Sequence, residues 1–139
     1  DGLSWRAEVS DKFHADIFIS IHCNSAENPE AHGTEVWYYP GSEQGRDLAC
    51  SIQAALVKNC HTNDRGVKTN DTWTVLKATA CPAVLVEMAF ISNEEERGLL
   101  TDCFLQRLFA VGITQGVCQF ARIGSLLSGN GECPAKADI

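Results

Sequence analysis

The chain contains no apolar run close to the roughly 18 residues that a membrane-spanning helix needs, and no leading charged-then-apolar segment of the kind that directs export. Positive charge is also scarce, because 11 lysine and arginine residues stand against 18 acidic residues, for a formal net charge of −7 at pH 7. No basic stripe offsets this balance. We therefore expect no membrane span and no nucleic-acid partner, whose phosphates the chain would repel.

Zinc-ribbon cysteine spacing is absent as well. The chain has seven cysteines in 139 residues, but none forms a C-x-x-C pair. Cys50 and Cys118 fall in apolar helical stretches, and we predict that both are buried free thiols. Hydrophobic residues make up 45% of the chain, which supports a core without disulfide staples. We favour reduced packing cysteines over a disulfide framework, and the redox compartment stays open.

Strand-like and helix-like segments alternate along the chain, which is typical of a single α/β domain with a three-layer, mostly parallel sheet flanked by helices. The predicted strands cover residues 15–22, 33–39, 74–77 and 83–88, the predicted helices cover 4–14, 42–59, a segment starting after 93, and 102–122, and residues 60–72 form a polar connector. We expect one domain over residues 1–124 and a tail over residues 125–139.

Two helix starts carry capping signals. Ser42 is a predicted N-cap, and Asn93 with Glu96 three residues later is a predicted capping box. The last predicted helix has one apolar face that should be buried, formed by Leu105, Leu108, Val111 and Val117.

His22 and Glu87 each stand at the C-terminal end of an apolar predicted strand. Reactive groups of open parallel sheets gather beyond these ends, where the loops diverge and open a crevice. A carboxylate that follows a buried strand has lost solvation and needs a cation, a metal or a proton. The alternative interpretations are a structural histidine with a satisfied ring, and a glutamate paired with an arginine or a helix N-terminus.

The sequence segments around both residues resemble those of one enzyme family. The segments that carry the resemblance are Ala15 to Asn24 (ADIFISIHCN), Gly33 to Tyr39 (GTEVWYY), Asp64 to Lys68 (DRGVK), Val75 to Lys77 (VLK) and Pro82 to Asn93 (PAVLVEMAFISN). In this order they are similar to motifs of the zinc-dependent N-acetylmuramoyl-L-alanine amidases of the amidase type 3 family, which hydrolyse peptidoglycan. The resemblance covers roughly residues 6 to 120.

The resemblance implies a Zn²⁺ cofactor, with His22 as a metal ligand and Glu87 as the catalytic carboxylate. It also points to Asn24 and Arg65 as substrate-binding residues. For Asn24 the alternative is plain hydrogen bonding within its loop, and for Arg65 it is a structural ion pair. The family's substrate implies action outside the cell or in the cell wall, on peptidoglycan, by a bacterial enzyme or a phage-encoded lysin.

The sequence departs from the family in two places. The family's other two zinc ligands, a histidine and a glutamate from an N-terminal stretch, have no counterpart in this sequence, and Ala89 replaces the usual glycine after the signature glutamate. His14, His32 and His61 do not obviously replace those ligands, and a rearranged site that uses Cys23 or His32 is the weakest alternative. We expect that the N-terminal part of the domain is missing from these residues, rather than that the chain is a truncated relative.

Three functions follow from these observations. The first is hydrolysis, by a zinc-activated water, of the amide between the lactyl group of N-acetylmuramic acid and L-alanine. The second is a catalytically inactive cell-wall-binding module without a complete metal site. The third is a zinc peptidase that acts on another amide. Autolysin, sporulation enzyme and endolysin are not distinguished by these residues, nor is the oligomeric state.

Overall fold

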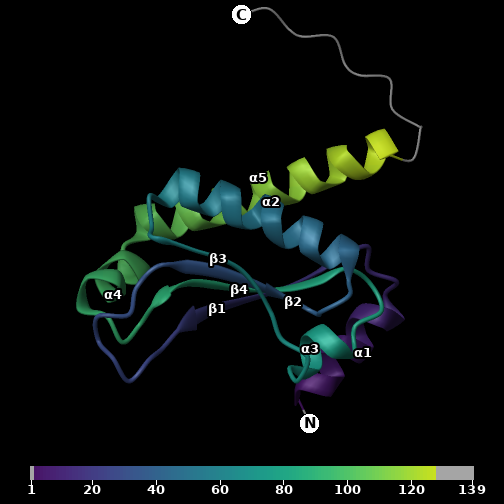
Figure 1. Ribbon diagram of the computed structural model, residues 1–139, viewed down its shortest axis with the longest axis horizontal. Helices are drawn as coiled ribbons and strands as arrows, with labels where there is room; N and C mark the ends of the chain where they lie inside the picture. The colour runs from purple at the N-terminus through teal and green to yellow at the C-terminus, as the bar shows by residue number, and fades with distance from the viewer. Residues whose placement is uncertain (1, 128–139) are drawn as a thin grey trace, which may run out of the picture.

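The computed structural model describes residues 2–127 and the side chains of residues 2–122. Along the chain the elements are α1 (Gly2–Lys12), β1 (Phe18–Asn24), β2 (Thr34–Tyr38), α2 (Glu43–Cys60), β3 (Asp64–Thr69), α3 (Thr74–Lys77), β4 (Ala83–Phe90), α4 (Glu94–Thr101) and α5 (Cys103–Leu127). Figure 1 shows α2 and α5 on one face of the sheet, α1 and α3 on the other face near one end, and α4 at the opposite end. The predicted three-layer α/β arrangement is confirmed.

The sheet is mixed. Its strand order is β1-β4-β2-β3, in which β1 pairs with β4 and β2 pairs with β3 in parallel, while β2 and β4 are antiparallel. Two of the three strand pairs therefore fit the predicted parallel arrangement. The antiparallel pair at the centre brings the start of β2 to the same end of the sheet as the ends of β1 and β4.

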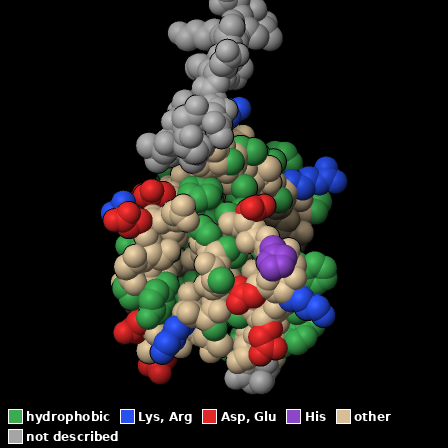
Figure 2. Space-filling view, turned by 90° about the vertical axis from the view of Figure 1, so that its right-hand side faces the viewer, with side chains coloured by type: hydrophobic (Ala, Val, Ile, Leu, Met, Phe, Trp, Pro, Cys, Tyr) green, Lys and Arg blue, Asp and Glu red, His purple; other side chains and the backbone are tan. Residues whose placement is uncertain are grey.

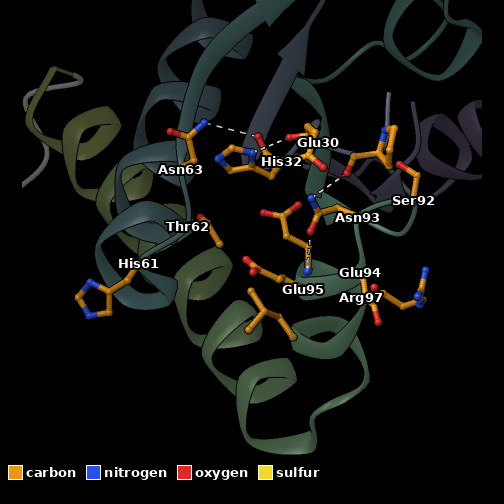
Figure 3. A pocket seen from close by; sticks show the side chains of 13 residues that line it. Glu30, His32, His61, Thr62, Asn63, Ser92, Asn93, Glu94, Glu95 and Arg97 are labelled. Carbon is orange, nitrogen blue, oxygen red and sulfur yellow. Dashed lines mark hydrogen bonds between the residues drawn. The ribbon is translucent and has the colours of Figure 1, made fainter. Parts of the chain in front are cut away.

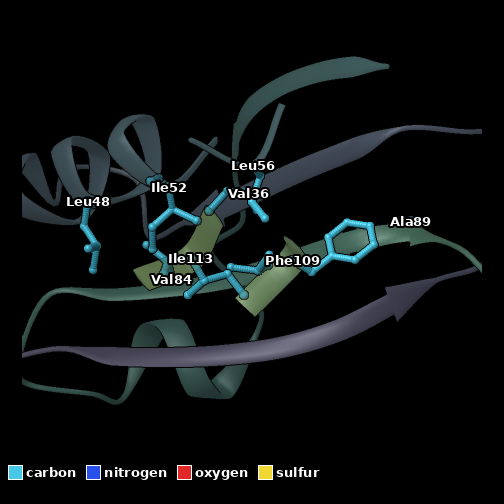
Figure 4. Packing of buried hydrophobic residues seen from close by; sticks show 10 residues of the cluster. Val36, Leu48, Ile52, Leu56, Val84, Ala89, Phe109 and Ile113 are labelled. Atoms are coloured by element: carbon cyan, nitrogen blue, oxygen red, sulfur yellow. The ribbon is translucent and has the colours of Figure 1, made fainter. Parts of the chain in front are cut away.

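The side chains of the central strands alternate between the two faces of the sheet. On one face Val36, Val84 and Val86 are fully buried against α2 and α5, in the cluster that Figure 4 shows. On the other face Leu85 packs with α3, in a smaller cluster. Full burial of one such apolar side chain stabilises the fold by about 1.5–3 kcal/mol. Because the smaller cluster covers only part of its face, the rest of that face is left for polar residues.

The last helix packs on α2 through a face that overlaps the predicted one only in part: Val117 packs against the main core, and Leu105 and Leu108 are half-buried. Val111 is exposed, so its predicted burial is wrong, whereas Phe109 and Ile113 are buried. Two glycines explain this orientation, since Gly112 and Gly116 let the α5 backbone approach α2 closely. A Cβ atom on Gly116 would lie 2.8 Å from the backbone nitrogen of Ile52. A stripe of glycines, rather than a wholly apolar stripe, therefore sets the contact.

Two predictions between α2 and β4 are wrong. Residues 74–77 form helix α3 rather than a strand, and the predicted connector at 60–72 contains strand β3. The Asn70 side chain accepts hydrogen bonds from the backbone N–H groups of Thr72 and Trp73, at 2.9 and 2.8 Å, and so turns the chain into α3. Polar residues suit β3 because it is an edge strand, with only β2 beside it.

The predicted N-cap of α2 is confirmed, because Ser42 Oγ accepts the backbone N–H of Gly45 at 3.0 Å. The predicted capping box of α4 is confirmed in one direction only. Asn93 Oδ1 accepts the backbone N–H of Glu96 at 3.1 Å. The Glu96 carboxylate does not return to Asn93 but binds the N–H groups of Gly33 and Phe90.

Within the described residues the cysteines are all free thiols, and Cys133 lies outside that part of the chain. The predicted burial of Cys50 and Cys118 is wrong, because both side chains are exposed. The buried side of α2 is formed by Leu48, Ala49 and Ile52 with their neighbours one turn on, and Cys50 points away from it. Apolar sequence surroundings did not reveal which side of the helix faces the sheet.

Helix α5 continues through Leu127, so residue 124 lies inside the helix, and the part of the expected tail beyond Leu127 is outside the described residues. Over residues 2–127, each helix is too short or too polar to cross a lipid bilayer.

Candidate active site

The C-terminal halves of β1 and β4 bring His22 and Glu87 together. These two residues are paired in the parallel β1–β4 register, so their side chains leave the same face of the sheet from neighbouring strands. Glu35 on β2 is the antiparallel partner of Glu87 on its other side. The three side chains thus form a row across β1, β4 and β2. Because the row lies beyond the small cluster of the α3 face, it is open on one side.

The carboxylate of Glu87 is half-buried and incompletely hydrogen-bonded. Its Oε2 atom is buried and has no hydrogen-bond partner among the described residues. Desolvation by burial, followed by the negative charge of Glu35, raises the pKa of Glu87 to about 7. A carboxyl group with this pKa exists in both protonation states near neutral pH, which is the property that a group needs in order to take up a proton and release it again.

His22 is held in a form suited to binding a metal. A hydrogen bond of 2.7 Å joins its Nε2 to Oγ of Ser20 on the same strand. Burial, and then the positive charge of Arg6, lowers the pKa of His22, so the imidazole is neutral at neutral pH. Neutral imidazole is the form that ligates metals, and a hydrogen bond to one ring nitrogen fixes the ring and directs the other nitrogen.

Glu35 was not predicted as a site residue, although it lies in the GTEVWYY segment. Its side chain is 5% exposed and forms ion pairs with Arg65 Nε, at 2.7 Å, and with Lys68 Nζ. Trp37 Nε1 donates to the same carboxylate at 3.1 Å. Burial acts to raise the pKa of Glu35, but the hydrogen bonds from Lys68 and Arg65 outweigh it and lower the pKa. Glu35 therefore stays ionised beside Glu87.

The two predicted substrate-binding residues both contact Glu35. Asn24 Nδ2 donates to Glu35 Oε1 at 2.9 Å, while Arg65 pairs with Oε2 and lies over the ring of Phe90, 4.8 Å from its centroid. The alternative anticipated for Arg65, a structural ion pair, is therefore present. The Arg65 side chain is still 31% exposed, so it is accessible from solvent.

A cavity of about 250 Å³ opens beside the row of polar residues. Its lining combines the reactive pair, His22 and Glu87, with a largely apolar wall. The full lining is Leu3, Ser20, His22, Trp73, Thr74, Val75, Leu85 and Glu87. Trp73 packs against Trp37 with ring centroids 5.0 Å apart, which holds the wall rigid. An apolar pocket with a few converging polar groups is the usual form of a small-molecule or substrate site.

A larger cavity of about 730 Å³ lies at the end of the sheet, between the β1–β2 loop, the end of α2 and the start of α4 (Figure 3). It does not contain His22 or Glu87, and several carboxylates line it. The smaller cavity is the candidate site, because among the described residues a neutral imidazole and a carboxyl group of raised pKa meet there.

A catalytic zinc ion takes three protein ligands. Over residues 2–127 no group of three histidine, cysteine, aspartate or glutamate side chains is arranged to hold a metal ion. The unpartnered oxygen of Glu87 and the neutral ring of His22 suit a nearby cation, but this chain supplies only part of a donor set.

On the face that Figure 2 shows, lysine and arginine side chains are scattered among acidic, apolar and uncharged ones.

Comparison with known proteins gives a consistent result. Residues 2–119 match the family described as N-acetylmuramoyl-L-alanine amidase. The N-acetylmuramoyl-L-alanine amidase LytC of Bacillus subtilis is 35% identical over 123 residues, which cover 86% of this chain and 24% of LytC. The uncharacterized protein YqiI of the same species is 40% identical over 118 residues, or 83% of this chain and 56% of YqiI.

Solved structures agree with the sequence matches. The crystal structure of N-acetylmuramoyl-L-alanine amidase from Clostridium difficile 630 superposes with a TM-score of 0.82 at 32% identity, over 86% of this chain and 65% of that one. The chain thus spans between about a quarter and two thirds of the length of these three proteins. Its fold and nearly all of its sequence place it in one group: the chain belongs to the N-acetylmuramoyl-L-alanine amidase family.

Proposed function

We propose that this chain carries the proton-transfer part of a peptidoglycan hydrolase, which cleaves the amide between the lactyl group of N-acetylmuramic acid and L-alanine. The observation that supports this most strongly is the pairing of His22 with Glu87, whose buried Oε2 lacks a partner, on the open face of the sheet. Family membership supplies the choice of substrate.

In this proposal Glu87 moves the proton. As the carboxylate it accepts a proton from the attacking water, and the hydroxyl oxygen bonds to the amide carbon. The same carboxyl group then gives the proton to the nitrogen of L-alanine as the C–N bond breaks, so the reaction returns Glu87 to its starting state. The pKa of about 7 supports both transfers near neutral pH.

We further propose that the protein uses Zn²⁺ and that His22 is one of its ligands. When bound at a catalytic site, zinc lowers the pKa of its water to about 7 and polarises the carbonyl group. His22 is one donor of the three that such a site requires, and the other described residues do not complete the set. The described residues alone therefore do not fit a tightly held catalytic zinc ion, and the role of Glu87 is derived from its own environment.

Asn24 and Arg65, which both contact Glu35, are proposed to bind substrate. Arg65 offers a partly exposed guanidinium to carboxylates of the peptide stem, while its Nε stays on Glu35. The backbone N–H of the exposed residue Ser25 donates to Asn24 Oδ1 at 2.8 Å. This bond holds the side-chain amide of Asn24 at the start of the loop. Action on peptidoglycan places the protein at the cell wall.

The decisive experiment measures release of L-alanine amino groups from purified peptidoglycan by the whole protein, with zinc added. Glu87→Gln should lower the rate by on the order of 10²–10⁴, whereas Glu27→Gln, a change of the same chemistry at an exposed position, should leave it unchanged. Full activity of Glu87→Gln would refute the proposal. Binding to peptidoglycan without any cleavage by the unmodified protein would instead favour the wall-binding module.

A further inference from the structure

The turn after β4 contacts the loop between β1 and β2 at three points. Ser92, Asn93 and Glu96, the polar residues of an S-N-x-x-E sequence, all reach residues 25–33 with their side chains. The contacts are Ala26 N to Ser92 Oγ at 3.0 Å, Asn93 Nδ2 to Pro29 O at 2.9 Å, and Gly33 N to Glu96 Oε1 at 2.7 Å. They fall at the start, the middle and the end of the loop. Figure 3 shows Ser92 and Asn93 beside Glu30 and His32 of this loop.

Glu96 is the buried member of this set. Its side chain uses both carboxylate oxygens on backbone groups, Oε1 on Gly33 and Oε2 on the N–H of Phe90 at 2.6 Å. One buried carboxylate therefore joins the start of β2 to the end of β4. Burial of a charge without partners is costly, and here two N–H donors together with the N-terminal turn of α4 offset that cost. An amide would replace one acceptor with a donor that faces an N–H.

Gly33 makes the contact with Glu96 possible. Its φ of +111° lies in a region that favours glycine, and a Cβ atom there would lie 2.9 Å from Cγ of Arg65. The backbone at this point is thus pressed between Arg65 and Glu96. Two residues further along, the chain reaches Glu35, so the position of Gly33 fixes where β2 begins.

The loop connects Asn24 to Glu35, the residue that is paired with Glu87 across β2 and β4. It starts at Asn24, whose backbone oxygen accepts the N–H of Ile91 at 2.7 Å, and it leads to Glu35. A hydrogen bond from Asn24 Nδ2 to Glu35 Oε1 joins the two ends of this segment. A shift of the loop therefore moves Asn24 and Glu35 relative to Glu87, which lies on the strand that carries the clamping turn.

We propose that Ser92, Asn93 and Glu96 act as a clamp: they are positioning residues that hold the loop of residues 25–33 and so keep Asn24 on Glu35, the neighbour of Glu87 on β2. The clamp touches neither the reactive pair nor the cavity beside it. Its consequence for catalysis rests on the proposed amidase function, but its effect on the loop does not.

Asn93→Asp is the sharpest variant. The aspartate keeps the oxygen that caps α4, since Asp is as good an N-cap as Asn, and it replaces the donor to Pro29 with a second acceptor. Glu96→Gln removes one of the two acceptors of the buried carboxylate. Glu95→Gln is the matched control, because it removes a charge from the same helical turn at an exposed position that makes no clamp contact.

The test combines amide hydrogen exchange with steady-state kinetics on the whole, metal-loaded protein. We expect the amides of the β1–β2 loop, including Ala26 and Gly33, to exchange about tenfold faster or more in Asn93→Asp and Glu96→Gln, while the core amides of α2 and β4 stay protected. At a temperature where all variants are folded, kcat should fall by on the order of 10- to 100-fold with little change in KM. Glu95→Gln should change neither quantity.

Unchanged exchange in the loop, or a uniform rise over the whole chain, would overturn the proposal, because either shows that the three contacts do not act locally. Faster loop exchange with an unaltered kcat would overturn the link to the site. Exchange does not require catalysis, so a protein that cleaves no peptidoglycan would refute the proposed function while the clamp is still decided by the loop amides.

Discussion

Glu87→Gln should stabilise the metal-free protein at alkaline pH, although it removes the proposed proton carrier. In the folded chain the pKa of Glu87 is raised from 4.5 to about 7. The folded state therefore holds the proton more tightly than the unfolded state. The contribution of this group to stability is complete below about pH 4.5, is lost as the pH rises to about 7, and is absent above that.

The full shift corresponds to about 3 kcal/mol. Glu87 is only half buried, so solvent screening reduces this figure, and we expect a cost of about 1–2 kcal/mol from the ionised carboxylate at pH 8. Glutamine at position 87 carries no charge and escapes this cost. The two proteins should thus differ in free energy of unfolding at pH 8 and converge at pH 5, where most of the carboxyl groups are protonated.

The assay is urea unfolding of both proteins with a chelator present, at pH 5 and pH 8. The chelator is needed because a bound cation would stabilise the carboxylate. Linear extrapolation at each pH gives the free energy of unfolding, and the difference between the two pH values isolates the charge. The same difference between the proteins at pH 5 and pH 8 would refute the reasoning, since the pKa of Glu87 would then be ordinary.

Three further predictions follow from the same structure. Ser20→Ala removes the hydroxyl that holds Nε2 of His22, and zinc affinity measured by calorimetry should fall by about 10- to 100-fold, with no change indicating that the ring needs no support. Glu35→Gln removes the negative charge beside Glu87 and leaves the two cations Arg65 and Lys68 unpaired. The pKa of Glu87 should therefore fall, and the acid limb of the pH–rate profile should move to lower pH. A move of that limb to higher pH would contradict this prediction. Gly116→Ala should cost about 1–3 kcal/mol by overpacking against Ile52, whereas Gly98→Ala, with open space around it, should gain up to about 1 kcal/mol, as thermal unfolding of the two variants would show.

The sequence was sufficient to place His22 and Glu87 on neighbouring strands, although both lie before the strand ends, because β1 runs to Asn24 and β4 to Phe90. Each follows an apolar run, and two such strands in parallel bring their C-terminal ends together. The register that sets the two residues directly opposite each other was not predictable, because it depends on how β1 and β4 pair along their whole length. Neither the direction of β2 nor its place between β4 and β3 was predicted from local patterns.

Glu35 was missed for a related physical reason. In the sequence it is one acidic residue in a short strand, and its importance depends on partners from elsewhere. Arg65 and Lys68 lie on β3, which was interpreted as a polar connector because an edge strand needs few apolar residues. One signal in the sequence could have revealed Glu35. It lies between Thr34 and Val36 on a predicted strand, and a buried acidic side chain there needs a cation as partner.

The short helix α3 shows how tertiary context overrides propensity. Thr74 and Val75 are β-branched and favour a strand, yet the Asn70 turn starts a helical turn there. Likewise, the spacing of Asn93 and Glu96 correctly predicted the cap of α4, but it did not reveal that Glu96 binds the backbone of two strands. A capping pattern specifies a local partner only when nothing more distant offers a better one.

The role proposed for His22 and Glu87 is tested most directly by a crystal structure of the whole protein with zinc, recorded with anomalous diffraction at the zinc edge. We expect a zinc ion about 2.0–2.1 Å from a ring nitrogen of His22, with the Glu87 carboxylate facing that ion. A zinc ion bound elsewhere, with His22 and Glu87 turned away from it in a protein that still cleaves peptidoglycan, would contradict this role.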